Sequence, residues 1–161
     1  MMSFRRPISA LAVLFAALAA TGCAGRPEPA SQQMLSLHVV PDVRLTVLEE
    51  RKDEVIRQLS HCESGGWGPS DRKIYGGRGA YHGRLQFTIR TVQAYVRMRD
   101  GLQLSARDAS ELAHDYDRAA DLAKYMIFDL EEPWHWPVCS RKIGMVAELR
   151  AIKTSYEALN R

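Results

Sequence analysis

Glu63 is the residue whose type and setting are best suited to chemistry in this sequence. It belongs to the block Cys62-Glu63-Ser64-Gly65-Gly66, which follows an amphipathic segment. A helix would hold the carboxyl group in place, and the glycines after it would let a polymer pass close to the backbone. Apolar neighbours can raise the pKa of a carboxyl group until it donates a proton near neutral pH. The block therefore predicts a general acid beside a cleft.

Two more blocks follow, Gly83-Arg84-Leu85-Gln86-Phe87 and Trp136-Pro137-Val138-Cys139. With the first block they resemble the signature of the resuscitation-promoting factors, which runs Cys-Glu-Ser-Gly-Gly, Gly-Gly-Leu-Gln-Phe and Trp-Pro-Val-Cys. The resemblance covers about residues 55–144. It implies a mainly α, lysozyme-like (α+β) fold, with several helices around a glycan cleft and a small β-hairpin or loop. It also implies an enzyme that cleaves peptidoglycan.

The resemblance further implies roles for individual residues. Glu63 would be the single catalytic glutamate of a lytic transglycosylase that cleaves the bond between N-acetylmuramic acid and N-acetylglucosamine. It would protonate the leaving oxygen and then accept the proton of the sugar's own 6-hydroxyl. Ser64 and Gln86 match polar elements of lytic transglycosylases, and Tyr81 stands where the family has aromatic residues. We expect these three residues to contact substrate.

Trp67, Trp134 and Trp136 have two interpretations each, because an indole ring either stacks on a sugar or fills core space. We assign Trp67 to substrate binding and Trp136 to the core. Gln86 also has an alternative role, as an amide that caps local backbone.

Asp71 is the acidic residue of the glycine-rich loop that follows Glu63. Glycosidases ordinarily use two carboxyl groups, but no motif places Asp71, and we expect it to be a solvated loop charge. Two alternatives to the transglycosylase stay open. One is a hydrolytic muramidase of the same fold, and the other is a non-catalytic, lipid-anchored protein that binds peptidoglycan.

The N-terminus is predicted to be a signal peptide over residues 1–22, with a basic start, a short apolar stretch and the sequence Ala20-Thr21-Gly22-Cys23 at its end. Small residues before a cysteine are typical of a lipobox, so Cys23 is predicted to carry lipid. The protein would then be exported and lipid-anchored in the cell envelope, facing the periplasm from the outer membrane if the organism is Gram-negative. Ordinary signal-peptidase cleavage nearby is the alternative.

The mature chain is predicted to have a tether over residues 23–44 and a lysozyme-like catalytic domain over residues 45–161, whose last helix extends beyond the resemblance. If Cys23 carries lipid, two cysteines remain, Cys62 and Cys139. Two cysteines left over in an oxidising compartment favour a disulfide bond. The resemblance implies the same pairing.

The formal net charge is only +3, and no basic run is present, which argues against nucleic acid as a partner. The expected partners are peptidoglycan strands and, through the lipid, a membrane. No cofactor is expected. No metal is expected either, because the histidines and cysteines show no regular ligand spacing; the histidines considered are His61, His82, His114 and His135.

Hydrophobic periodicity predicts the helices that would position these residues. The first would begin at a capping box, Thr46-x-x-Glu49, and end with Glu63. Residues 65–81 contain six glycines, which predicts a loop or small hairpin.

Further helices are expected from Ile89 to near Gly101, from Ser105 to Pro133 with a possible break at His114-Asp115, and over about residues 142–159.

Overall fold

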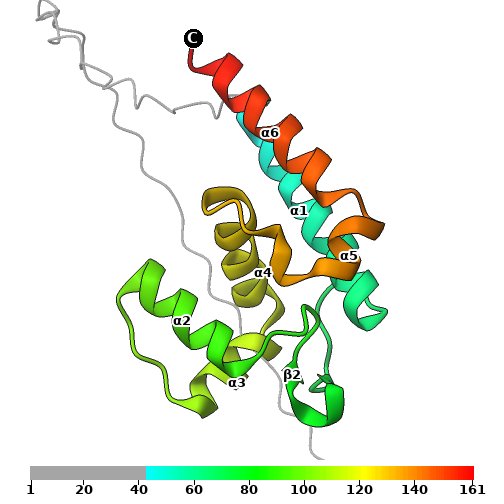
Figure 1. Ribbon diagram of the computed structural model, residues 1–161, viewed down its shortest axis with the longest axis vertical. Coiled ribbons are helices and arrows are strands. Elements are labelled where there is room, and N and C mark those ends of the chain that lie inside the picture. Colours follow the sequence, from blue (N-terminus) through cyan, green and yellow to red (C-terminus); the bar gives the residue numbers. More distant parts are fainter. Residues whose placement is uncertain (1–42) are drawn as a thin grey trace, which may run out of the picture. The chain divides into compact units, whose positions relative to one another are not determined.

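The computed structural model describes residues 43–161 (Figure 1). The predicted signal peptide over residues 1–22, the lipid acceptor Cys23 and nearly all of the predicted tether lie outside the described residues. In the described part, no helix is long and apolar enough to cross a membrane. This part is mainly helical with a two-stranded antiparallel sheet and a disulfide bond, as predicted.

Helix α1 (Val43–Ser64) begins three residues before the predicted capping box, so that prediction was wrong. Thr46 is a helical residue and caps nothing. The Glu49 carboxylate accepts hydrogen bonds from Lys52, at 2.8 Å, and from the Tyr156 hydroxyl instead of turning back to the backbone. The acidic side chain that would complete a capping box is therefore committed to other partners.

The C-terminal end of α1 was predicted correctly, because the helix ends at Ser64 and carries Glu63 in its last turn. Gly65 follows with a φ of +75°, a left-handed conformation that glycine adopts without strain and that commonly ends helices. One face of α1 is buried, and its apolar residues are Leu48, Val55, Ile56 and Leu59.

The glycine-rich segment forms the predicted hairpin. Strands β1 (Tyr75–Gly76) and β2 (Tyr81–His82) pair antiparallel, and the short 3₁₀ turn η1 (Gly77–Gly79) joins them. Gly83 follows with a φ of +73°, and a Cβ atom there would lie 1.6 Å from the carbonyl oxygen of Ala113. Only glycine permits this approach, which brings the hairpin against the third helix.

The next helices follow the predicted signals. They are α2 (Ile89–Asp100), α3 (Ala106–His114) and α4 (Tyr116–Lys124). Ser105 caps α3 by accepting a hydrogen bond from the backbone N–H of Asp108 at 3.1 Å. The predicted break falls at Asp115, whose carboxylate accepts from the N–H of Arg118 and so starts α4.

The last third of the chain is more segmented than the hydrophobic pattern predicts. Helix α4 continues into a π-helical turn, η2 (Tyr125–Asp129), and then come η3 (Pro133–His135), α5 (Pro137–Lys142) and α6 (Met145–Leu159). Helix α5 begins with a proline, which is tolerated in a first helical turn because no intrahelical bond is lost there. Figure 1 shows α6 running alongside α1, against which it packs.

The Cys62–Cys139 disulfide is present as predicted, with sulfur atoms 2.08 Å apart, and it joins the last turn of α1 to α5. Trp136 is buried in the core, again as predicted. Its indole N–H donates a hydrogen bond of 2.8 Å to the carbonyl oxygen of Leu85, and its ring meets the edge of Phe87 with centroids 5.4 Å apart.

Replacing both cysteines, as Cys62→Ser/Cys139→Ser, should lower the free energy of unfolding by roughly 2–5 kcal/mol, because the bond closes a long loop in the unfolded chain. Urea unfolding followed by circular dichroism measures the difference. Each single serine variant should lose about as much as the pair. Labelling of both thiols by an alkylating reagent in unreduced, exported protein would contradict the bond.

Candidate functional site

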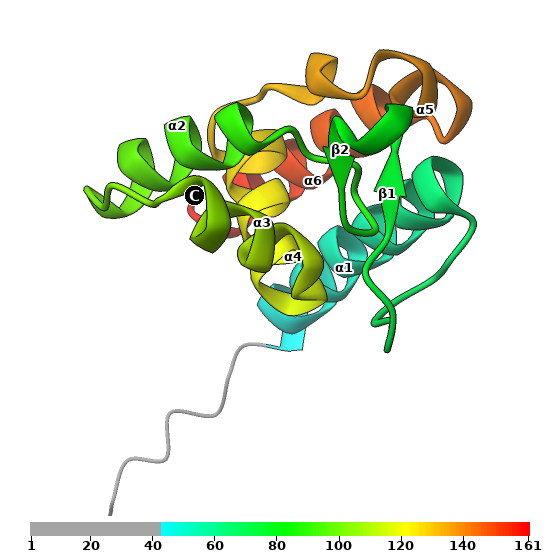
Figure 2. The ribbon, with the colours of Figure 1, turned by 90° about the horizontal axis from the view of Figure 1, so that it is seen from below.

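Glu63 lies at a hollow of about 290 Å³ that residues of α1, β2 and α5 help to line. Figure 2 shows the end of α1 next to α5, with the β1–β2 hairpin beside them. Each of the three sequence blocks contributes to its wall. The lining residues are Glu63, Tyr81, Gln86, His135, Trp136, Pro137 and Val138. Segments that are more than seventy residues apart in the sequence, such as Glu63 and Trp136, thus meet at one site.

Two bonds hold the three blocks together. The disulfide joins Cys62, beside Glu63, to Cys139 at the end of the third block. The hydrogen bond from Trp136 to Leu85 joins the third block to the second. Because Trp136 is almost fully buried, this hydrogen bond has no competing water and fixes the indole ring as one wall of the hollow.

The Glu63 carboxyl group is half-buried, and no hydrogen bond or ion pair within the described chain engages it. Burial raises its pKa above the ordinary 4.5, and the positive charge of Lys142 opposes this shift without cancelling it. The position of Glu63 in the last turn of α1 acts in the same direction as burial, since the negative end of a helix disfavours a carboxylate. A carboxyl group in this setting keeps its proton at higher pH than a solvated one.

Gln86 is the second polar residue of the hollow that the sequence singled out, and its backbone is unusual. Its φ is +51°, a left-handed conformation that few residues other than glycine adopt. The side-chain amide donates to the carbonyl oxygen of Gly83 at 2.7 Å. A Cβ atom on Gly76 would lie 1.8 Å from Oε1 of Gln86, so a larger residue there would displace the Gln86 amide from its present position. Gln86 thus both binds local backbone and lines the hollow.

Of the four residues expected to contact substrate, the structure places two at the hollow and two elsewhere. Tyr81 and Gln86 line the hollow, whereas Ser64 and Trp67 do not. The Ser64 hydroxyl donates to the carbonyl oxygen of Ser60 at 3.0 Å, within α1. Trp67 is 55% exposed and stacks on His61 with ring centroids 4.1 Å apart, just beyond the end of α1.

Asp71 is exposed and lines a different hollow, together with Lys73, Glu111 and His114. It is therefore not brought together with Glu63. Within the residues that line the Glu63 hollow, Glu63 has the only carboxyl group.

His135 is a site residue that sequence reasoning missed. From the sequence, metal binding is the one role that arises for it, and the described residues contain no group of three or more histidines, cysteines or acids placed to hold a metal ion. Its position directly before the third block, next to Trp136, was the one available signal. In the structure it lines the Glu63 hollow.

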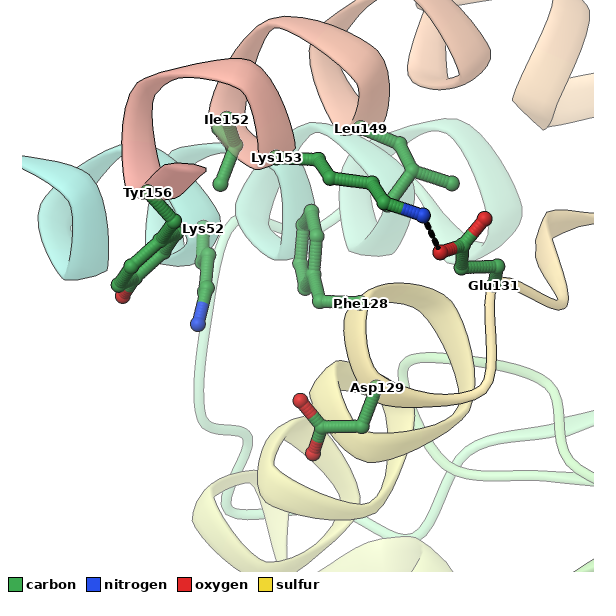
Figure 3. Close-up of a pocket in the computed structure, with 8 residues that line it drawn as sticks. All are labelled: Lys52, Phe128, Asp129, Glu131, Leu149, Ile152, Lys153 and Tyr156. Carbon is green, nitrogen blue, oxygen red and sulfur yellow. Dashed lines mark hydrogen bonds and ion pairs between the residues drawn. The ribbon is translucent and has the colours of Figure 1, made fainter. Parts of the chain in front are cut away.

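A further hollow of about 280 Å³ lies between α1, η2 and α6 (Figure 3). Its wall is partly apolar, with Phe128 and Ile152, and it carries two lysines. Lys153 forms an ion pair with Glu131, and Lys52 lies 4.7 Å from the centre of the Tyr156 ring. These cations are engaged within the protein, in contrast to the Glu63 carboxyl group.

Comparison with protein-family models finds no match, and comparison with curated proteins and with solved structures finds no significant match. The resemblance to the resuscitation-promoting factors rests on the three short sequence blocks alone.

The unpaired Glu63 carboxyl group should reduce stability at neutral pH. Because its pKa is raised in the folded protein, the folded state holds this proton more tightly than the unfolded state, and stability falls as pH rises above about 4.5. Glu63→Gln should therefore have a free energy of unfolding at pH 7 at least equal to that of the wild type, with the difference shrinking at pH 4.

Urea unfolding of both proteins at the two pH values measures this. Glu54→Gln, on the same helix, is the control, because the Glu54 carboxylate is held by Arg57 and Gln58 and its pKa is lowered. A clear loss of stability at pH 7 in Glu63→Gln would mean that the carboxylate makes a stabilising contact.

Proposed function

We propose that this protein is a lytic transglycosylase of lysozyme-like fold that cleaves peptidoglycan between N-acetylmuramic acid and N-acetylglucosamine. The observation that carries the proposal is the setting of Glu63, which is half-buried, unpaired and placed where the three family-like blocks meet. A raised pKa suits a carboxyl group that must arrive at the substrate with its proton.

In the proposed reaction, Glu63 donates its proton to the glycosidic oxygen as the bond from this oxygen to C1 of N-acetylmuramic acid breaks. The 6-hydroxyl oxygen of the same sugar then attacks C1, and its proton passes to the Glu63 carboxylate. The acid is regenerated, no water is consumed, and the product carries a 1,6-anhydro ring. A single carboxyl group is sufficient for this route, and Glu63 is the carboxyl group of the hollow.

Tyr81 and Gln86 are the proposed substrate contacts within the hollow, through the aromatic ring and the side-chain amide. A volume of about 290 Å³ is at the small end for ligand sites, so it fits roughly one sugar ring. Neighbouring sugars would lie over the adjoining surface. The exposed Trp67 ring offers a stacking face there, while the Ser64 hydroxyl is already bonded within α1.

Glu63→Gln should reduce the release of soluble fragments from insoluble peptidoglycan to background, because the amide keeps the shape of the side chain but has no acidic proton to donate. Asp71→Asn is the matched control and should keep most of the activity, since Asp71 lines a different hollow. If Glu63→Gln releases soluble fragments at nearly the wild-type rate, Glu63 is not the catalytic acid.

The two remaining alternatives give distinct results in the same assay. A collapse of activity in Asp71→Asn would favour a muramidase with two carboxyl groups. Sedimentation of the wild-type protein with peptidoglycan, without any release of fragments, would favour a binding protein.

The proposed location is the cell envelope, with lipid attached at Cys23. Cys23→Ser should move the protein from the membrane fraction to the soluble fraction, because the site of lipid attachment is lost while the described domain is untouched. Fractionation followed by intact mass measurement checks this. A wild-type protein that is soluble and cleaved elsewhere than before Cys23 would contradict it.

A further inference from the structure

His135 is a polar side chain of the Glu63 hollow that the proposed mechanism does not use. It lies at the end of η3, directly before Trp136. Two side chains contact its ring from the side: Tyr95, which comes from α2, and Glu132, which precedes η3. The three residues form a cluster that we call the His135 cluster.

The geometry of the His135 cluster fixes the ring. The Tyr95 hydroxyl donates a hydrogen bond to Oε2 of Glu132, and its oxygen lies 2.6 Å from Nε2 of His135. The same Glu132 oxygen is 3.4 Å from Nε2. The Tyr95 and His135 rings also meet edge to face, with centroids 5.1 Å apart and planes at 88°. Helix α2 thereby positions a residue of the hollow that is forty positions away in the sequence.

A count of hydrogens assigns the protons in this cluster. The Tyr95 hydroxyl has one hydrogen, which Glu132 receives, so Nε2 of His135 must supply the hydrogen of the 2.6 Å contact. Burial and the hydrogen bond to Glu132 raise the pKa of Tyr95 to about 12, which keeps this hydroxyl protonated. A neutral imidazole with its hydrogen on Nε2 has a lone pair on Nδ1. No hydrogen bond within the described chain uses Nδ1 of His135.

We propose that His135 binds substrate in the Glu63 hollow by accepting, at Nδ1, a hydrogen bond from a hydroxyl group of the glycan, with Tyr95 and Glu132 as positioning residues. The inference rests on the proposed function, because that function identifies the ligand as a sugar. It adds an acceptor that the three sequence blocks do not contain. Because Glu132 orients the Tyr95 hydroxyl, which in turn fixes the tautomer of His135 through Nε2, the free nitrogen is ready to bind at little entropic cost.

Two isosteric variants separate substrate binding from a merely structural role of His135. In His135→Asn, an amide oxygen can take the place of Nδ1, but the contact with Tyr95 is lost. In His135→Gln, the amide nitrogen can take the place of Nε2 and keep the contact with Tyr95, but no acceptor stands at the Nδ1 position. His135→Ala removes both groups.

The measurement is the Kd for a tetramer of N-acetylglucosamine, determined by calorimetry with all variants in the Glu63→Gln background, so that turnover does not interfere. His135→Ala and His135→Gln should raise Kd about tenfold, the loss expected for one hydrogen bond to a neutral acceptor. His135→Asn should stay within about threefold of the parent. The same order should appear as a rise in KM, with kcat changed less, in proteins that retain Glu63.

Three outcomes would overturn the inference. Retention of affinity by His135→Gln together with loss in His135→Asn would show that His135 only holds η3 in place. Equal affinities for all variants would show that Nδ1 does not contact the sugar. If the Glu63→Gln parent does not bind the tetramer at all, the hollow does not bind this sugar and the inference is wrong. Failure of the proposed function is recognised separately, since it appears as a lack of peptidoglycan cleavage by the wild type even when the tetramer binds.

Discussion

The disulfide bond between Cys62 and Cys139 and the hydrogen bond from Trp136 to Leu85 bring three distant segments to one place. They add to the packing of the helices and to the hydrogen bond from Arg84 to the carbonyl oxygen of Gly68, which already links the loop after α1 to the Gln86 turn. Both bonds lie next to the hollow and not at the far side of the core. They therefore stiffen the part of the fold where, in the proposed function, Glu63 is held against a substrate, and small displacements at such a place cost the most activity.

The Glu63 environment shows a conflict between stability and chemistry. A carboxyl group with no partner, half-removed from water at the negative end of a helix, is an unfavourable element of a folded protein. Lys142 relieves only part of this cost. By contrast, Glu54 on the same helix is paired with Arg57 and Gln58. Unfavourable environments that the rest of the fold can sustain are common at functional sites, because the groups placed there must remain free to react.

Much of the fold could be predicted from the sequence, because its signals are local. The left-handed glycines after α1 and α2, the serine cap of α3 and the break at Asp115 each depend on a few neighbouring residues. The predicted start of α1 is wrong for the opposite reason. Glu49 had a possible local role as a cap, but Tyr156, from the other end of the chain, engages its carboxylate. No local pattern contains that partner.

The site was predictable to the same extent. Glu63, Gln86 and Tyr81 were found from short motifs, and the structure places all three at one hollow. His135 could not be found in this way, because its significance depends on Tyr95, which lies forty residues away on a different helix. Trp67 and Ser64 were named from the same motifs, but the positions of their side chains depend on the ring of His61 and the carbonyl of Ser60.

The most direct test of the central claim, that Glu63 acts alone and that the sugar's own hydroxyl attacks, is digestion of peptidoglycan in water enriched in oxygen-18. Mass spectrometry of the released muropeptides then reports the source of the new oxygen bond at C1. The proposed mechanism predicts 1,6-anhydromuramic ends whose mass lacks the elements of water and which carry no oxygen-18. Reducing muramic ends that carry one oxygen-18 atom would contradict it, because a water molecule would then have attacked and a group to activate that water would be required.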